Sequence, residues 1–253
     1  MKHKINQMNI QFLGTGGAFD LEYGNSSAII NQDGENILID CGFSVFPQLV
    51  KTGLIEHIDK ILITHLHDDH VGGLSSLVLY YYYKLNLGKV KILVPNQLFK
   101  NEILNFLKST TVYPEKYVSF SFLDKSENIK YINTSNKHIK GMTSFGYVFF
   151  DSGNTIVYSG DIASADTIFD WLKEGNINQA TVFHDVCFNY NGVHAFYKDL
   201  IPYLHKYKIF GYHCNPEQNV ADNPIPLVAN HKEFLFSCKD NLKESKLVIS
   251  KRA

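Results

Sequence analysis

The chain has 253 residues, of which 45% are hydrophobic, 13% aromatic and 19% charged, a profile typical of a globular protein that excludes global disorder. Its 24 Lys and Arg residues nearly balance its 25 Asp and Glu residues, so the chain lacks the basic field that holds a long polyanion. The sequence contains no run of 18 apolar residues and no signal-peptide pattern, so we expect no membrane partner. These features predict a cytoplasmic protein folded as a single domain over residues 1–253.

Strand and helix patterns alternate along the chain. Short β-branched runs bounded by Gly, Asn or Asp predict strands, and apolar residues at helical spacing predict helices. In the first half, the predicted strands are 10–13, 27–30, 37–39, 61–64 and 92–94, and the predicted helices are 46–52, 74–85 and 97–108. In the second half, the predicted strands are 118–122, 146–150, 155–158, 181–184 and 209–212, and the predicted helices lie near 165–174 and 194–206.

The order of these elements predicts a fold class. Strands followed by helices, twice, predict an α/β protein of two halves packed sheet to sheet with helices outside. Residues 151–154 have the composition and length of a tight hairpin turn between two strands. The region after residue 215 contains three prolines and weak periodicity, and its structure stays open.

A cluster of metal-capable side chains directly follows the predicted strand at 61–64. Three histidines and two aspartates occupy six consecutive positions: His65, His67, Asp68, Asp69 and His70. Zinc and similar cations favour imidazole and carboxylate ligands, and a loop at a strand end can point alternate residues into one site. The spacing predicts two metals, with His65 and His67 on one and Asp69 and His70 on the other. A solvated polar loop or a single structural site is the alternative, and we expect Asp68 either to face solvent or to help position a ligand histidine.

This His-x-His-x-Asp-His pattern resembles the metallo-β-lactamase superfamily, and more closely its ribonuclease Z-like phosphodiesterase branch. Residues 12–17 (Phe-Leu-Gly-Thr-Gly-Gly) resemble the first-strand turn of that branch, and residues 38–42 (Leu-Ile-Asp-Cys-Gly) resemble its second marker. The resemblance covers roughly residues 10–215. It implies the metallo-β-lactamase αββα sandwich, in which two packed mixed sheets carry helices on the outside.

The same resemblance implies the remaining metal ligands. His138 is similar to the third-motif histidine of the family and would complete the His65/His67 site, although it could also be a surface histidine. Asp161, in Tyr-Ser-Gly-Asp, resembles the aspartate that bridges both metals; a turn-capping Asp is the alternative. His213 ends a strand as the last family ligand does and would complete the second site, unless it is a core histidine. The implied cofactors are two divalent ions, zinc or alternatively manganese.

A proton donor is implied by residues 182–188 and by His194. The stretch Val-Phe-His-Asp-Val-Cys-Phe resembles the ribonuclease Z segment in which a histidine-acid pair precedes a small residue, a hydroxyl and Phe. His194 resembles the family histidine that begins a helix and protonates the leaving oxygen, and Asp185 would orient it. Asp185 departs from the usual Glu by one methylene. Simple helix capping is the alternative for His194, and we interpret His184 as a packing or supporting residue rather than a catalytic one.

The implied reaction is metal-assisted phosphodiester hydrolysis, with Asp69 holding the attacking water as well as binding metal. Ribonuclease Z enzymes carry a Gly- and Lys-rich arm between the third-motif histidine and the bridging aspartate, but here 161 − 138 = 23 positions separate the two residues. The arm is therefore absent, which makes large RNA a less expected partner and favours a small nucleotide substrate.

The compact, armless members of this branch include cyclic-nucleotide phosphodiesterases of the anti-Pycsar type, which destroy cyclic-nucleotide immune signals. The chain resembles them in length, in its Leu-Gly-Thr-Gly-Gly opening and in His194. The resemblance implies hydrolysis of 3′,5′-cyclic nucleotides to linear monophosphates. Two alternatives stay open: tRNA 3′-end processing by an armless ribonuclease Z-like enzyme, and a nucleotide-binding module without catalysis.

Four consecutive tyrosines, residues 80–83, follow the metal loop on a predicted helix. Helical geometry spreads them around all sides, so at most two share a face. Stacking on a nucleobase is one interpretation, and core or subunit packing is the one that we favour. Relatives in this branch are commonly homodimers joined through helices after the metal loop, so we expect a homodimer.

Overall fold

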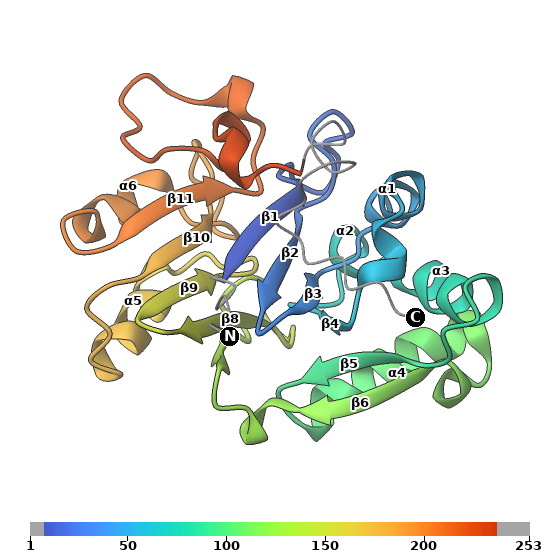
Figure 1. The fold of residues 1–253 in the computed structure, drawn as a ribbon. Coiled ribbons are helices and arrows are strands. Elements are labelled where there is room, and N and C mark those ends of the chain that lie inside the picture. The colour runs from blue at the N-terminus through green and yellow to red at the C-terminus, as the bar shows by residue number, and fades with distance from the viewer. Residues whose placement is uncertain (1–7, 237–253) are drawn as a thin grey trace, which may run out of the picture.

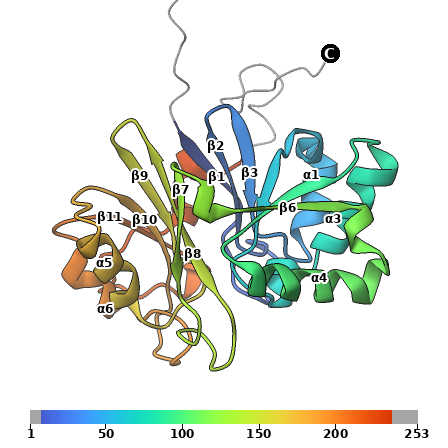
Figure 2. The ribbon, with the colours of Figure 1, turned by 90° about the horizontal axis from the view of Figure 1, so that it is seen from below.

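Two β-sheets pack face to face at the centre of the protein, and helices cover the outer side of each (Figures 1 and 2). The computed structural model describes residues 8–236. The first sheet has the spatial order β1 (Asn9–Gly14), β2 (Ser27–Gln32), β3 (Glu35–Ile39), β4 (Lys60–Leu62), β5 (Val90–Val94) and β6 (Val118–Phe122). The second has the order β11 (Lys208–Tyr212), β10 (Thr181–Asp185), β9 (Asn154–Tyr158), β8 (Phe145–Asp151) and β7 (Ile129–Asn133).

The helices complete a four-layer arrangement. Helices α1 (Val45–Thr52), α3 (Leu74–Leu79) and α4 (Gln97–Thr111) lie on the first sheet, and α5 (Ala165–Glu174) and α6 (Tyr197–Leu200) lie on the second (Figure 2). The short helix α2 (Asp68–Val71) stands between β4 and α3 in the chain. The predicted fold class, an α/β protein with the metallo-β-lactamase αββα sandwich, is confirmed. No helix in the described part of the chain is both long and apolar enough to cross a membrane.

Both sheets are mixed, and their parallel strands determine where polar side chains meet. The pairs β3–β4, β4–β5, β5–β6, β9–β10 and β10–β11 are parallel. The pairs β1–β2, β2–β3, β7–β8 and β8–β9 are antiparallel. The carboxyl ends of parallel strands reach one edge of a sheet, where loop residues are free of the ladder. The segments that follow β4, β9, β10 and β11 therefore converge on one end of the sandwich.

A buried aromatic cluster joins the two sheets. The ring of Phe12 on β1 lies 5.9 Å from Tyr158, 5.2 Å from Phe183 and 5.6 Å from Tyr212, which belong to β9, β10 and β11. All four side chains are buried. Close aromatic pairs of this kind add to the free energy of burial and have preferred geometries. Their contact fixes the position of one sheet relative to the other.

The prediction of a helix near 194–206 is wrong about where the helix starts. Residues 197–200 form α6 and Ile201–Tyr203 form a 3₁₀ turn, whereas His194 lies in a bend before them. The backbone here pairs with residue 187 instead: the Cys187 amide donates to the Ala195 carbonyl, and the Tyr197 amide donates to the Cys187 carbonyl. Those groups are therefore not available for an earlier helical turn, and Pro202 supplies no amide hydrogen to extend a regular one.

Four further segments bear on the sequence predictions. The helix predicted at 74–85 changes after α3 into a π-helical turn, Tyr80–Lys84, and strand β7 has no counterpart among the predictions. The predicted hairpin turn is confirmed between β8 and β9, where Ser152 and Gly153 both have positive φ as a two-residue turn requires. The region left open after residue 215 contains short 3₁₀ turns as far as residue 234, and residues 237–253 lie outside the described part.

Candidate metal centre

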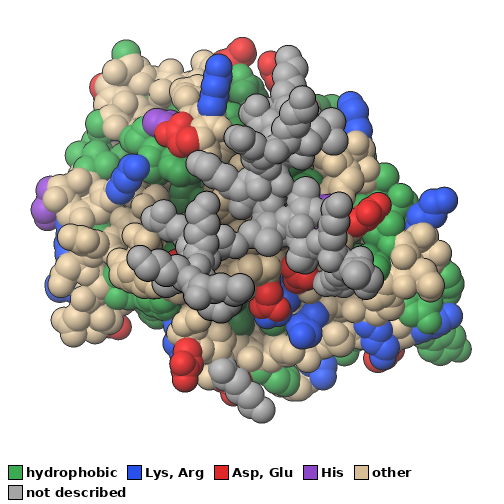
Figure 3. All heavy atoms as spheres, in the orientation of Figure 1, with side chains coloured by type: hydrophobic (Ala, Val, Ile, Leu, Met, Phe, Trp, Pro, Cys, Tyr) green, Lys and Arg blue, Asp and Glu red, His purple; other side chains and the backbone are tan. Residues whose placement is uncertain are grey.

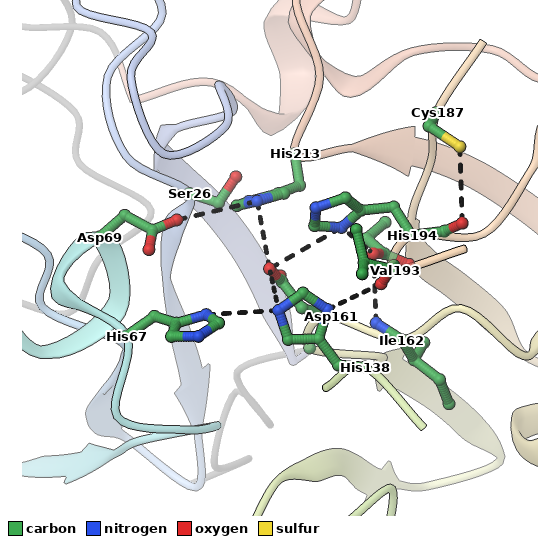
Figure 4. A network of polar contacts seen from close by, with 12 residues as sticks. Ser26, His67, Asp69, His138, Asp161, Ile162, Cys187, Val193, His194 and His213 are labelled. Atoms are coloured by element: carbon green, nitrogen blue, oxygen red, sulfur yellow. Dashed lines mark hydrogen bonds and ion pairs between the residues drawn. The ribbon is translucent and has the colours of Figure 1, made fainter. Parts of the chain in front are cut away.

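The nominated metal ligands and the His194–Asp185 pair gather at the converging end of the sandwich, and Figure 4 shows His67, Asp69, His138, Asp161, His194 and His213 around one point. The nominated side chains come from seven places in the order of elements. His65 and His67 follow β4, Asp69 and His70 belong to α2, His138 lies between β7 and β8, Asp161 follows β9, Asp185 ends β10, His194 precedes α6, and His213 follows β11. Asp68 is exposed, which agrees with the first of the two expectations for it.

Three imidazoles form the first group of ligand atoms. His65 Nε2 lies 3.0 Å from His67 Nδ1, which lies 3.3 Å from His138 Nε2. Two nitrogens bound tetrahedrally to one zinc ion at roughly 2.0–2.1 Å would lie about 3.3 Å apart. The spacing and the chemistry of this group therefore suit one divalent cation.

Two carboxylates and two imidazoles form the second group. His70 Nε2 lies 3.2 Å from Asp69 Oδ2 and 3.3 Å from Asp161 Oδ1, and His213 Nε2 lies 3.2 Å from Asp161 Oδ2. All four residues are buried. Despite these short separations, His70 Nε2 and Asp161 Oδ1 have no hydrogen-bond partner in the described part of the chain. Buried lone pairs that converge without hydrogen bonds fit a cation placed between them.

Asp161 connects the two groups. Its Oδ1 faces the second group, and its Oδ2 lies 4.0 Å from His65 Nε2 and 3.8 Å from His138 Nε2 in the first. The side chain is only 2% exposed. This is the position that a bridging carboxylate would occupy, so the residues present fit two divalent ions.

The pKa values of three histidines and of Asp161 suit metal binding. Burial lowers the pKa of His65 and His213 below that of a free imidazole, and it does the same for His67. Burial alone would raise the pKa of Asp161, but the neighbouring imidazoles, chiefly those of His213 and His70, hold it well below its usual range. Neutral imidazoles and ionised carboxylates are the forms that ligate cations. His70 differs, because burial would lower its pKa but the charges of Asp161 and Asp40 raise it well above its ordinary value, so a cation bound there displaces a proton.

Three of the histidines are oriented by hydrogen bonds at Nδ1, the ring nitrogen that points away from the cluster. His65 Nδ1 donates to Thr64 Oγ1 over 3.0 Å, and His138 Nδ1 donates to the Val193 carbonyl over 2.7 Å. His70 Nδ1 donates to Asp40 Oδ2 over 2.8 Å. Each bond uses Nδ1 and turns Nε2 toward the cluster, which is the usual support for a metal-binding histidine.

Asp40 is a supporting residue to which sequence reasoning assigned no role. Besides His70, this buried carboxylate accepts hydrogen bonds from the Thr64 amide over 2.7 Å and the Thr64 hydroxyl over 2.8 Å. Because Thr64 in turn orients His65, Asp40 supports one histidine in each group. The sequence feature that could have indicated this role is an acidic residue directly after a buried strand, in the stretch 38–42. Its backbone has a φ of 61°, a strained value for a residue with a side chain.

Gly42 lets the metal loop approach the segment that contains Asp40. A Cβ at Gly42 would lie 2.0 Å from the Asp69 carbonyl oxygen, and a Cβ at Gly73 would lie 2.5 Å from the Gly42 carbonyl oxygen. The Cys41 amide also donates to the His70 carbonyl over 2.8 Å. Glycine is thus required here by close backbone contact, which holds α2 against the end of β3.

His194 and Asp185 form a pair beside the cluster. His194 Nδ1 lies 2.8 Å from Asp185 Oδ2, which also accepts a hydrogen bond from the Ile162 amide over 3.1 Å. The shorter side chain of Asp185 therefore still reaches the histidine. Burial lowers the pKa of His194, but the hydrogen bond and charge of Asp185 raise it by more, so this pKa lies above its ordinary value. The arrangement favours a protonated imidazole 3.8 Å from Asp161 Oδ2.

His184 takes no direct part in the cluster. Its ring is fully buried and stacks on Phe169 with centroids 6.1 Å apart, and its Nδ1 donates to the Asp185 carbonyl over 2.8 Å. This position agrees with the interpretation of His184 as a packing or supporting residue.

The fold and the buried His/Asp cluster define a metal-dependent hydrolase of the metallo-β-lactamase fold. The chain is similar to the metallo-β-lactamase fold protein YhfI from Bacillus subtilis, with a TM-score of 0.66 and 18% identity over 85% of this chain and 89% of that one. It is also similar to human tRNase Z, short form, with a TM-score of 0.62 and 21% identity over 85% of this chain and 95% of that one.

Sequence comparison assigns the chain to a narrower group. The family model described as anti-Pycsar protein Apyc1 matches residues 8–234. The anti-Pycsar protein Apyc1 of Bacillus phage BSP38 is 34% identical over 221 residues, which cover 79% of this chain and 85% of the relative. The chain therefore belongs to the anti-Pycsar protein Apyc1 family.

The Asp40 contacts lead to a prediction about metal affinity. We expect Asp40→Asn to weaken zinc binding about 10- to 100-fold, because an amide cannot accept all three hydrogen bonds that orient Thr64 and His70. Isothermal titration calorimetry of the metal-stripped protein would measure the affinity. Asp124→Asn, which changes an exposed carboxylate outside the cluster, is the control. Equal zinc affinity in Asp40→Asn and the unmodified protein would contradict the assigned role.

Proposed function

We propose that the protein is a dinuclear-metal phosphodiesterase that hydrolyses 3′,5′-cyclic nucleotides to linear monophosphates. The observation that carries this proposal is the His194–Asp185 pair, which stands next to Asp161 at the edge of the two ligand groups. The charge and hydrogen bond of Asp185 raise the pKa of His194, so this imidazole carries a proton at the edge of the cluster, and it is only partly buried there. The pair supplies a proton donor for a leaving alkoxide.

Each part of the cluster has a separate task in this reaction. We propose zinc for both positions, because imidazole-rich sites suit it. Two divalent ions would lower the pKa of a water molecule and withdraw charge from the phosphate oxygens. Asp69, with its carboxylate at the second group, would orient the attacking water. His194 would donate its proton to the departing ribose oxygen while Asp185 keeps the ring in place.

A cavity beside the cluster has the size for a small nucleotide. Its volume is about 580 Å³, and both His194 and His213 contribute to its wall. Small-molecule sites commonly have volumes of roughly 300–1,000 Å³. The charged residues in this wall, apart from the histidines, are Asp20 and Glu22, and the described part of the wall contains no Lys or Arg. A substrate with one phosphate, bound by the metal centre, fits this cavity better than a long polyanion does.

Two further observations argue against RNA as the substrate. Between His138 and Asp161, where ribonuclease Z enzymes carry their gripping arm, the chain forms only β8, β9 and the turns around them. On the face seen in Figure 3, Lys and Arg side chains are scattered among acidic ones and form no continuous patch. With 24 Lys and Arg against 25 Asp and Glu in the whole chain, a strong electrostatic hold on a long RNA is not expected. The family name anti-Pycsar, with the resemblance described above, supports the cyclic-nucleotide substrate.

The substrate class is tested by product analysis. We expect the zinc-loaded protein to convert 3′,5′-cyclic mononucleotides to linear monophosphates, and Asp161→Ala to abolish the reaction because both ligand groups lose a carboxylate oxygen. Liquid chromatography would follow a panel of cyclic mononucleotides, cyclic dinucleotides and a 3′-extended tRNA precursor. Cleavage of the tRNA precursor alone would refute the proposal in favour of tRNA processing, and binding without turnover would indicate a non-catalytic module.

The role of His194 predicts a dependence on the leaving group. We expect His194→Ala to lower the hydrolysis rate of a cyclic nucleotide by about 10²- to 10⁴-fold, but that of bis(p-nitrophenyl) phosphate far less, because nitrophenolate leaves without protonation. His205→Ala, at an exposed histidine, is the control. An equal loss on both substrates, together with a lower zinc content, would identify His194 as a metal ligand instead.

We also propose that two copies associate through a tyrosine surface formed by Tyr82, Tyr83, Tyr113 and Lys116, which packs on the buried Tyr117. Of the four consecutive tyrosines, Tyr81 packs in the core, whereas Tyr83 is 61% exposed. The Tyr83 and Tyr117 hydroxyls lie 3.0 Å apart, and Lys116 Nζ lies between 5.2 and 5.6 Å from the ring centres of Tyr82, Tyr83 and Tyr117. Exposed aromatic clusters with one cation are typical of protein interfaces.

Light scattering tests this association. We expect a mass of about twice 28.8 kDa for the unmodified protein, and we expect Tyr83→Glu to give the mass of one chain because it places a carboxylate at the centre of the contact. Leu98→Glu, at an exposed residue of α4, should leave the mass unchanged. A single-chain mass for the unmodified protein at all concentrations would exclude the homodimer.

A further inference from the structure

Phe19 is almost fully exposed at the mouth of the cavity. Its side chain is 95% exposed, more than any other large hydrophobic residue in the described part of the chain. The loop that contains it, residues 17–22, forms one wall of the cavity that His194 and His213 also line. Leu21, 79% exposed, stands in the same wall, so two apolar side chains face the open cavity together. Exposed apolar groups gathered at a cavity mark a ligand-binding surface.

Hydrogen bonds hold this loop in one conformation. Asp20 Oδ1 accepts from the Glu22 and Tyr23 amides over 3.1 and 2.9 Å, and the Asp20 amide donates to the Gly17 carbonyl over 3.2 Å. Asn25 Nδ2 donates to the carbonyl of Ala18 over 3.3 Å. The segment that carries Phe19 is therefore pre-organised, which lowers the entropy cost of binding a ligand against it.

The same loop begins in contact with the metal cluster. The Cys214 amide donates to the Thr15 carbonyl over 3.2 Å, so the end of β11 and the start of the loop are joined. A Cβ on Gly17 would lie 3.9 Å from His213 Nε2, the atom that faces Asp161. Phe19 follows Gly17 by two residues. A molecule whose phosphate binds at the cluster would consequently extend its other end along this loop.

We propose that Phe19 is the stacking surface for the nucleobase of the substrate, which makes residues 17–22 the base subsite of the enzyme. The proposal rests on the proposed function and adds the residue that binds the part of the substrate remote from the phosphate. Stacking on a phenyl ring accepts any base, because every nucleobase has a π-face. Asn189 and Gln218, exposed in the same cavity wall, each offer an amide donor and acceptor to the base edge.

Steady-state kinetics with three substitutions at one position test this subsite. We expect Phe19→Ala to raise KM for cyclic AMP about 5- to 150-fold, the range for loss of one base-aromatic stack, with kcat nearly unchanged. Phe19→Trp should keep the low KM, and Phe19→Leu, which retains apolar bulk without a π-face, should resemble Phe19→Ala. Leu98→Ala, at an exposed apolar residue outside this wall, should behave as the unmodified protein. An unchanged KM in Phe19→Ala overturns the proposal.

A binding measurement separates this proposal from the proposed function. The chain contains one tryptophan, Trp171 on α5, which does not line the cavity. Adenosine, which lacks a phosphate, should quench the indole fluorescence of Phe19→Trp and leave that of the unmodified protein unchanged. Quenching without any cyclic-nucleotide hydrolysis would uphold the base subsite and refute the proposed reaction. Hydrolysis without quenching would refute the subsite, as would a fall in mass by light scattering on Phe19→Ala, since Phe19 would then contact a second copy.

Discussion

The burial of Asp161 among imidazoles is the constraint on which the rest of this structure depends. An ionised carboxylate that is 2% exposed has a large desolvation cost unless cations or hydrogen-bond donors compensate it. Here its two oxygens face both ligand groups, and one oxygen has no hydrogen bond in the described residues. The cluster is therefore a poor arrangement for stability by itself and a good one for two cations. The rigid surrounding fold keeps the Asp161 carboxylate buried despite this desolvation cost.

That rigidity comes from contacts on both sides of the cluster. The aromatic rings around Phe12 fix the two sheets relative to each other, so the strand ends of both sheets stay aligned. Closer to the site, Asp40 orients one histidine in each group through direct or relayed hydrogen bonds. Gly42 and Gly73 allow the backbone of α2 to approach that carboxylate. The ligand geometry is thus determined by packing and hydrogen bonds rather than by the flexible loop alone.

The chemistry and the selectivity of the site reside on different segments. The metal ligands and the His194–Asp185 pair are held at strand ends, whereas the cavity wall consists of loops, including residues 17–22. A rigid reactive centre with a loop-built recognition surface is a common arrangement in α/β folds. In the proposed reaction, the neutral and acidic wall leaves the substrate's phosphate to the metal centre. Recognition of the remainder then depends on stacking and amide contacts, for which Phe19 is suitably placed.

The sequence by itself determined the order of most strands and helices, and the local His-x-His-x-Asp-His pattern, because hydrophobic periodicity and ligand spacing are short-range properties. His138, Asp161 and His213 could be nominated only through family resemblance, since no local pattern links residues so far apart in the chain. Tertiary structure alone decided that Asp40 supports both ligand groups and that His194 lies in a bend, where backbone pairing with residue 187 excludes an earlier helix start. It also decided that Phe19 is exposed beside the site. Such features arise from contacts between distant segments, and local propensity carries no information about them.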